Sequence, residues 1–258
     1  MDQVNAKDHT ILTRSEGPAA EVINPGGTAP ICLVCEHASS FIPASLQHLG
    51  LSPEHRKSHA AWDIGAMDLA VELSVALNAP LVASRVSRLV YDCNRPPSAQ
   101  DAIPAKSEVI EVPGNAGLSE NQRAARVAEI YDPFRQTLVS TLDTFATPPA
   151  VVTIHSFTPV WHGKRREVEL GFLHDADDRL ATLMLAHAPR DVDARLNAPY
   201  SADDGVTHTL REHAIPRRLQ NVMIEVRNDM ISDASGVARF SHILGELLTT
   251  ALMPQEAT

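Results

Sequence analysis

The sequence predicts a single three-layer α/β/α domain whose central sheet is mixed but largely parallel. Short apolar runs of strand length alternate along the chain with longer segments of helical periodicity. No linker rich in proline, glycine or serine divides the 258 residues, and 44% of them are hydrophobic, which is enough for one large core. We therefore expect an irregular lead-in at residues 1–29, followed by one domain at residues 30–258.

The first half of the domain is expected to contain short strands, two long helices and one long loop. Serine is a favoured N-cap and proline a favoured first helical residue, so Ser52-Pro53 predicts a helix start. Ser119 and Gln122 have the spacing of a capping box. The helix they begin should run to about residue 145, with a bend near Pro133. The predicted strands are residues 31–35, 81–83 and 89–91, the other helix is 64–77, and the loop is 103–117.

The second half continues the alternation of strands and helices. Buried strands are predicted where apolar runs are continuous, and helices where apolar residues recur with helical spacing. The predicted strands are residues 151–154, 168–172, 221–226 and, more weakly, 192–196. The predicted helices are residues 177–187, 206–213 and 236–252.

Charge and composition exclude several classes of protein. With 22 basic and 32 acidic residues the formal net charge is −10, so the chain lacks the positive field that binds nucleic acid or anionic membranes non-specifically. Three cysteines are too few for a disulfide scaffold. Proline and histidine interrupt the longest uncharged stretch, and the N-terminus resembles no signal peptide. We expect a cytoplasmic protein that acts on a small molecule.

Polar side chains follow several of the apolar runs, and they are the candidates for a functional site. In largely parallel sheets, ligands bind at the carboxyl ends of the strands. His37 and His155 each follow a predicted strand, and Trp62-Asp63 forms a turn between them. Two imidazoles and a carboxylate are a suitable ligand set for zinc, although either histidine alone could be a structural residue.

Other polar residues at the same strand ends allow both a functional and a structural interpretation. Asn94-Arg95 could clamp a substrate carboxylate or form a turn with a surface ion pair. Glu225 lies on a buried strand, so it must be paired, face a metal or be catalytic, and Arg227 could be its partner. The Arg165-Arg166 pair is typical of a solvated basic turn.

Other familiar sites are absent or improbable. Cys32 and Cys35 should face opposite sides of a strand, which favours buried small side chains over a metal or redox pair. The chain has no phosphate-binding glycine loop and no G-x-S-x-G elbow. Ser156 directly follows His155, and adjacent strand residues face apart, which argues against a Ser–His relay.

Five short segments occur in an order that resembles the N-formylglutamate amidohydrolase family. Together they extend the resemblance over about residues 31–250, nearly the whole domain. The segments are Cys35-Glu36-His37-Ala38-Ser39, Trp62-Asp63-Ile64-Gly65-Ala66, residues 87–96, His155-Ser156-Phe157-Thr158-Pro159 and Glu225-Val226-Arg227-Asn228.

The resemblance implies a zinc-dependent hydrolase with the α/β/α fold of zinc carboxypeptidases, which cleaves N-formyl-L-glutamate to formate and glutamate. It also implies a place in amino-acid metabolism, namely histidine degradation. The residue roles that it implies are His37, Asp63 and His155 as metal ligands, Glu225 as general base, Arg88 as oxyanion donor, and Asn94 and Arg95 as the clamp for the substrate carboxylate. We add Ser156 and Arg227 as further candidates for substrate binding.

The chain departs from the family pattern in two places. A Glu36-His37-Ala38-Ser39 turn stands where the family tends to have Pro-His-Ser/Ala-Gly, and Trp62-Asp63 stands where it has Trp-His. Glu36 is therefore the alternative to Asp63 as third ligand, and specificity for glutamate is less strictly implied. The alternative functions are a zinc carboxypeptidase, a de-N-acylase with another substrate, or a binding protein that keeps the fold without catalysis.

Overall fold

A seven-stranded mixed sheet forms the middle layer of the protein in the computed structural model, which describes residues 10–253. Strands β3, β2, β6 and β11 run parallel to one another, while β1 and β9 pair antiparallel to β3 and β11. This arrangement confirms the predicted mixed, largely parallel sheet. The order is β1 (Ala20–Ile23), β3 (Leu81–Ser84), β2 (Ile31–Cys35), β6 (Ala150–Phe157), β11 (Asn221–Arg227), β9 (Leu170–Leu173) and β10 (Ala194–Leu196).

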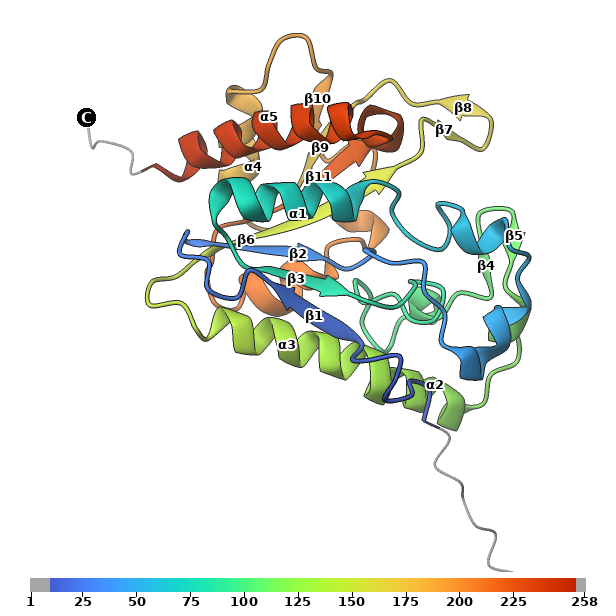
Figure 1. Ribbon diagram of the computed structural model, residues 1–258. Coiled ribbons are helices and arrows are strands. Elements are labelled where there is room, and N and C mark those ends of the chain that lie inside the picture. Colours follow the sequence, from blue (N-terminus) through green and yellow to red (C-terminus); the bar gives the residue numbers. More distant parts are fainter. Residues whose placement is uncertain (1–9, 254–258) are drawn as a thin grey trace, which may run out of the picture.

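Helices cover both faces of the sheet and complete the three layers (Figure 1). On one face lie α1 (Ala66–Leu77), α4 (Arg179–Ala186) and α5 (Ala234–Leu252). On the other lie α2 (Glu120–Arg126) and α3 (Asp132–Leu142). Asp233 is the N-cap of helix α5, and its side chain accepts a hydrogen bond from the Gly236 amide at 2.9 Å.

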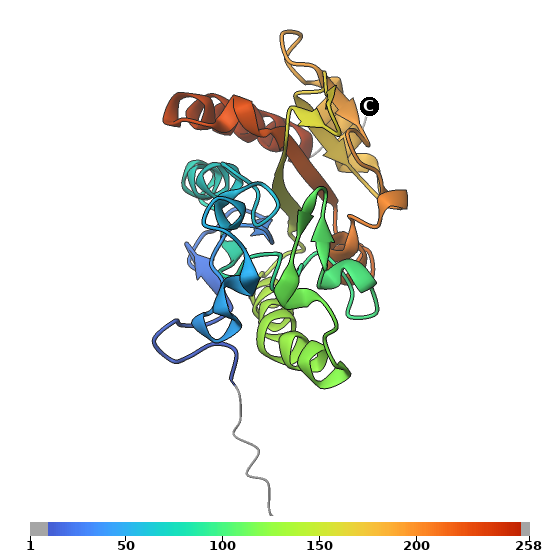
Figure 2. The same ribbon diagram turned by 90° about the vertical axis from the view of Figure 1, so that its right-hand side faces the viewer.

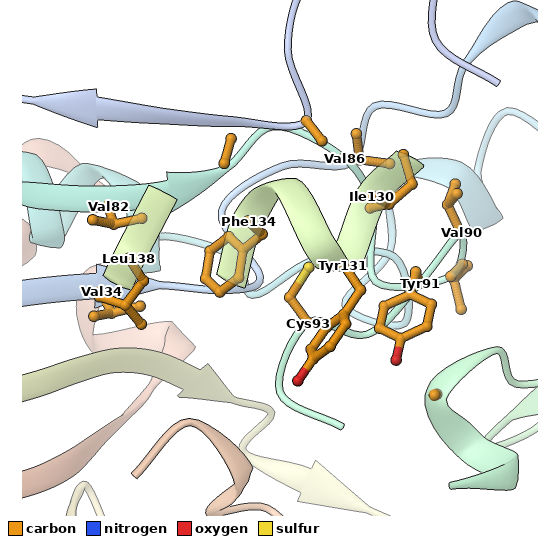
Figure 3. Close-up of a cluster of buried hydrophobic side chains, with 14 of the residues drawn as sticks. Val34, Val82, Val86, Val90, Tyr91, Cys93, Ile130, Tyr131, Phe134 and Leu138 are labelled. Atoms are coloured by element: carbon orange, nitrogen blue, oxygen red, sulfur yellow. The ribbon is translucent and has the colours of Figure 1, made fainter. Parts of the chain in front are cut away.

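The core on the α3 face shows how the apolar runs are buried. Val34 and Val82 project from the sheet toward Phe134 and Leu138 of α3 (Figure 3). Cys32 belongs to this cluster, whereas Cys35 lies in the cluster on the opposite face. The predicted alternation of the two side chains is therefore confirmed, and both cysteines are free thiols buried in the core.

The helix predicted for residues 119–145 is interrupted in its middle. The predicted capping box is present, since the Gln122 amide donates to the Ser119 side chain and the Gln122 side chain accepts from the Ser119 amide. Between α2 and α3, residues Val127–Tyr131 form a π-helical turn that ends just before Pro133. The predicted bend is thus a turn with the wider hydrogen-bond spacing of a π-helix, and it precedes a proline that cannot donate a backbone hydrogen bond.

Residues 89–91 do not form the predicted strand. They belong to a turn in which the Ser87 carbonyl accepts hydrogen bonds from the Val90 and Tyr91 amides at 2.8 and 3.4 Å. The three side chains are buried, so their apolar character reflects packing against the α3 face and not strand pairing.

Smaller differences concern the edges of the fold. The lead-in, expected to be irregular, contributes edge strand β1, while residues 1–9 lie outside the described residues. The predicted loop at 103–117 contains a small hairpin of β4 (Lys106–Ser107) and β5 (Ile110–Glu111). The helix predicted at 206–213 is a π-helical turn, η7 (Leu210–Ala214), and the start predicted at Ser52-Pro53 leads only into a short 3-10 turn, η2 (His55–Lys57).

Within residues 10–253, we find no helix with the length and apolar character needed to cross a bilayer. The carboxyl ends of β2, β6 and β11 share one edge of the sheet, on the right in Figure 1 and toward the viewer in Figure 2. The β4–β5 hairpin and a second hairpin, β7 (Val160–Trp161) with β8 (Lys164–Arg165), stand on this side of the molecule.

Candidate active site

A cavity of about 670 Å³ opens at the carboxyl edge of the sheet. All the site residues predicted from the sequence line it except Arg227. The predicted residues that line the cavity are His37, Asp63, Arg88, Asn94, Arg95, His155, Ser156 and Glu225.

Three of these side chains converge on a single point. Oδ2 of Asp63 lies 3.2 Å from Nδ1 of His37 and 2.9 Å from Nδ1 of His155, and the two nitrogen atoms are 3.2 Å apart. A tetrahedral zinc ion with ligands at about 2.0 Å has edges of about 3.3 Å between ligand atoms. The spacing and the chemistry of this donor set therefore fit one face of a zinc coordination shell.

The far nitrogen of each imidazole faces a buried carboxylate. Nε2 of His37 lies 2.7 Å from Oδ1 of Asp92, and Nε2 of His155 lies 3.1 Å from Oε2 of Glu36. Carboxylates behind the rings orient metal-binding histidines and fix which nitrogen carries the proton. Glu36, the alternative third ligand, thus lies behind His155 and not among the converging atoms. Asp92 belongs to a segment that the sequence analysis singled out, yet this contact was not predicted.

The fold explains why these residues meet. Glu225 of β11 and His155 of β6 are partners in the parallel register, so their side chains leave the same face of the sheet. His37 follows β2, and its carbonyl accepts a hydrogen bond from the Asp63 amide at 3.0 Å. The Ser156 amide donates to Oδ2 of Asp63 at 3.3 Å, and the Ser156 hydroxyl donates to the Ile64 carbonyl at 2.8 Å. Ser156 therefore holds the Asp63 turn against β6.

The buried charges favour a cation at this point. Burial opposes ionisation of Asp63, but the facing imidazoles of His37 and His155 outweigh it and hold the pKa of Asp63 well below its ordinary value. Burial likewise opposes the charged form of His155, but Glu36 and Asp63 raise its pKa well above the ordinary value. The carboxylates thus create a strongly negative environment around the two imidazoles.

Glu225 differs from Glu36, Asp63 and Asp92 in having no imidazole or guanidinium within ion-pair distance among the described residues. Its Oε2 atom is buried and has no hydrogen-bond partner among the described residues. Burial is the main reason that the pKa of Glu225 is raised to about 7. A carboxylate with a pKa near neutrality, on the wall of a cavity beside a candidate metal site, is suited to accept and return a proton.

Arg88 connects two of the acidic groups. Its guanidinium contacts Oδ1 of Asp63 at 3.3 Å and Oδ2 of Asp92 at 2.9 Å. The side chain is still 29% exposed and reaches the cavity. Arg88 can therefore position both carboxylates while presenting positive charge to a bound molecule.

The Asn94-Arg95 pair lies on the cavity wall and is largely engaged by the chain itself. The Asn94 amide donates to the Val206 carbonyl and accepts from the Thr209 amide. Arg95 contacts Asp101 at 2.9 Å and donates to the Gly205 carbonyl at 3.0 Å. These contacts join the turn after β3 to the segment that precedes η7.

Arg227 lies apart from the site. Its guanidinium contacts Asp229 at 2.8 Å and donates to the Glu167 carbonyl at 2.9 Å. Arg227 does not line the cavity, and Glu225 is not among its hydrogen-bond partners. The predicted contact between Arg227 and substrate has no geometric support, and we leave it out of the site.

One arginine of the cavity wall was not predicted. Arg166, expected to belong to a solvated turn, lines the cavity together with Trp161 and Tyr200. Its neighbour Arg165 is exposed, as expected for the turn. No local pattern distinguishes the two arginines, since Tyr200 lies far along the chain from Arg166.

Comparisons with known proteins find a matching family model and similar solved structures. The family model for N-formylglutamate amidohydrolase matches residues 29–232. A crystal structure of an Agrobacterium tumefaciens gene product is 49% identical, covering 94% of this chain and 98% of that one, with a TM-score of 0.91. The crystal structure of an N-formylglutamate amidohydrolase from Ralstonia eutropha shares the fold at 16% identity, covering 90% and 97% of the two chains with a TM-score of 0.63. A search of curated proteins finds no match.

Proposed function

The chain belongs to the N-formylglutamate amidohydrolase family, whose members hydrolyse an amide, and from this premise we propose that it removes the formyl group of a small N-formyl amino acid. N-formyl-L-glutamate is the proposed substrate, and formate and L-glutamate are the products. We further propose that the hydrolysis is zinc-dependent.

The observation that carries this proposal is the donor set at the carboxyl edge of the sheet. His37, Asp63 and His155 present two imidazole nitrogens and one carboxylate oxygen at the mutual distances of a tetrahedral site. Glu225, buried and without a hydrogen bond at Oε2, lines the same cavity. This combination supports hydrolysis over simple binding, because a binding protein has no need of an unpartnered carboxylate beside a metal site.

In the proposed reaction, water adds to the formyl carbon and the C–N bond breaks. His37, Asp63 and His155 would hold the zinc ion, which would supply Lewis-acid polarisation and make water acidic near neutral pH. Glu225 accepts the proton of the attacking water and returns it to the leaving amine nitrogen, so that formate and the amino acid are released. Its pKa, raised by burial, supports both transfers near neutral pH.

The arginine and asparagine side chains position the substrate. Arg88, partly exposed on the cavity wall, is the proposed donor to the oxygen that becomes negative. Asn94 and Arg95 follow Arg88 in the sequence and line the same cavity. We assign the α-carboxylate of the substrate to this pair, which orients the amide for attack.

The test is formate release from N-formyl-L-glutamate by the purified protein, first stripped of metal and then titrated with zinc. We expect no turnover in the stripped protein and recovery at about one zinc per chain, as for a site with three protein ligands. Zinc binding without formate release would overturn the proposed substrate. A protein that binds no zinc would overturn the ligand assignment itself.

A further inference from the structure

Arg166 differs from the other arginines of the cavity wall in its partners. Arg88 contacts Asp63 and Asp92, and Arg95 contacts Asp101. Among residues 10–253, no carboxylate lies within ion-pair distance of Arg166. Its guanidinium makes a long hydrogen bond, 3.4 Å, to the Thr158 carbonyl. The cavity thus contains a cation whose charge the described part of the chain does not neutralise.

Three aromatic rings hold the Arg166 guanidinium in place. Its central carbon lies 4.8 Å from the ring centre of Tyr200, 5.1 Å from that of Trp161 and 5.4 Å from that of Phe157. All three rings also line the cavity. Cation–π contacts of this kind hold a guanidinium in place without using its N–H donors, which stay available to an acceptor.

We propose that Arg166 binds the side-chain carboxylate of an acidic N-formyl amino acid and so makes the enzyme selective for a substrate with two carboxylates. This inference rests on the proposed function, in which Asn94 and Arg95 hold the α-carboxylate. The second carboxylate then needs its own cation, and Arg166 is the arginine of the described cavity wall without an acidic partner. A guanidinium that keeps its in-plane donors binds both oxygens of a carboxylate.

The test compares Arg166→Gln with three substrates that differ only in charge. They are N-formyl-L-glutamate, N-formyl-L-glutamine, which lacks the side-chain charge, and the α-amide of N-formyl-L-glutamate, which lacks the α-carboxylate. Loss of a charge-assisted hydrogen bond should lower kcat/KM about 10- to 100-fold for N-formyl-L-glutamate and its α-amide. For N-formyl-L-glutamine the change should stay below about 3-fold, since the lost partner is absent.

Arg165→Gln is the matched control, because it removes the same charge from the neighbouring, exposed position of the hairpin. It should leave kcat/KM unchanged for all three substrates. Equal losses for the three substrates in Arg166→Gln would overturn the proposal, because they would show that Arg166 only supports the cavity wall. Insensitivity of the α-amide alone would also overturn it, by assigning Arg166 to the α-carboxylate.

Product binding separates this inference from the proposed function. Calorimetric titration with L-glutamate and L-glutamine requires no turnover. Arg166→Gln should weaken the binding of L-glutamate about 10-fold or more and leave that of L-glutamine unchanged. That result would support the role of Arg166 even if the wild-type protein released no formate. Unchanged L-glutamate binding in a variant with wild-type thermal stability would overturn the role, whatever the reaction proves to be.

Discussion

Substitution of Glu225 tests proton transfer without disturbing the proposed metal ligands. In Glu225→Gln the side chain keeps its size but can no longer accept a proton. His37, Asp63 and His155 are untouched, so we expect the variant to bind zinc as the wild type does. Its kcat should fall about 10²- to 10⁴-fold, the range associated with loss of a general base. Formate release and zinc content, measured on the same preparation, check both parts.

Glu72→Gln is the control for this substitution, since Glu72 is exposed on α1 and does not line the cavity. Its kcat should equal that of the wild type. If Glu225→Gln kept its turnover, Glu225 would not be the base. Loss of zinc from the variant would instead place Glu225 among the ligands.

Asp92 tests whether the carboxylate behind an imidazole contributes to metal affinity. Oδ1 of Asp92 lies 2.7 Å from Nε2 of His37, on the far side of the ring from Asp63. Asp92→Asn keeps the shape but removes the charge that polarises the ring. Changes of this kind lower metal affinity about 10- to 100-fold, and we expect the zinc affinity of the variant to fall within that range. Competition with a chromophoric chelator measures the change, and an unaltered affinity would contradict the prediction.

A strand could be predicted from the sequence where its own residues are buried along their whole length, and not where it forms by pairing with a distant segment. Strand β2 was predicted to the residue, because Ile31–Cys35 is buried along its whole length and its apolar run is continuous. Strand β1 was missed, because it is a partly exposed edge strand formed by pairing with the distant β3. Residues 89–91 were mistaken for a strand, because their apolar side chains indicate burial, and a buried turn and a buried strand have the same apolar pattern.

The same distinction applies to the site. His37 follows a buried strand, and His155 and Glu225 lie near the carboxyl ends of two others, where a polar side chain has few structural reasons to occur, so these residues could be found. Arg166 could not be found, because the rings around it come from segments as distant as Tyr200. Sequence patterns thus identified residues near strand ends, and missed contacts between distant segments, such as those of Arg166.

Arg126 connects a helix to the turn that carries two site residues. Its side chain is buried without a carboxylate partner, and burial lowers its pKa to about 10. The guanidinium donates to the Val90 carbonyl at 2.9 Å and to the Asn115 side chain at 2.6 Å. Val90 lies between Arg88 and Asp92, so α2 supports the turn that holds both.

Arg126→Met should therefore lower the free energy of unfolding. The buried acceptors would lose their donor, which costs about 2–4 kcal/mol in the free energy of unfolding. Arg123→Met, on the same helix but only half-buried, is the control and should cost less than about 1 kcal/mol. Urea unfolding measures both values. An Arg126 variant as stable as the Arg123 variant would contradict the role assigned to the buried guanidinium.

For the whole molecule, His213 predicts how stability changes with pH. It is buried in η7, its Nδ1 atom has no hydrogen-bond partner among the described residues, and burial lowers its pKa to about 4. An unfolded histidine titrates near pH 6.5. Between about pH 6.5 and pH 4, His213 is protonated in the unfolded chain but neutral in the folded chain. The contribution of His213 to stability is thus complete above pH 6.5 and is lost as the pH falls toward 4, by about 3 kcal/mol in all.

His213→Gln isolates this contribution, because every other titrating group is common to the variant and the wild type. The difference in free energy of unfolding between the two proteins should shift by about 3 kcal/mol in favour of the variant between pH 7 and pH 4. Urea unfolding at half-unit pH intervals provides the curves, and His242→Gln, at an exposed position of α5, is the control. Parallel curves for His213→Gln and the wild type would show that the imidazole becomes protonated in the folded protein. If the difference between the two free energies of unfolding instead shifts toward the variant as the pH falls, the buried imidazole of His213 stays neutral in the folded protein.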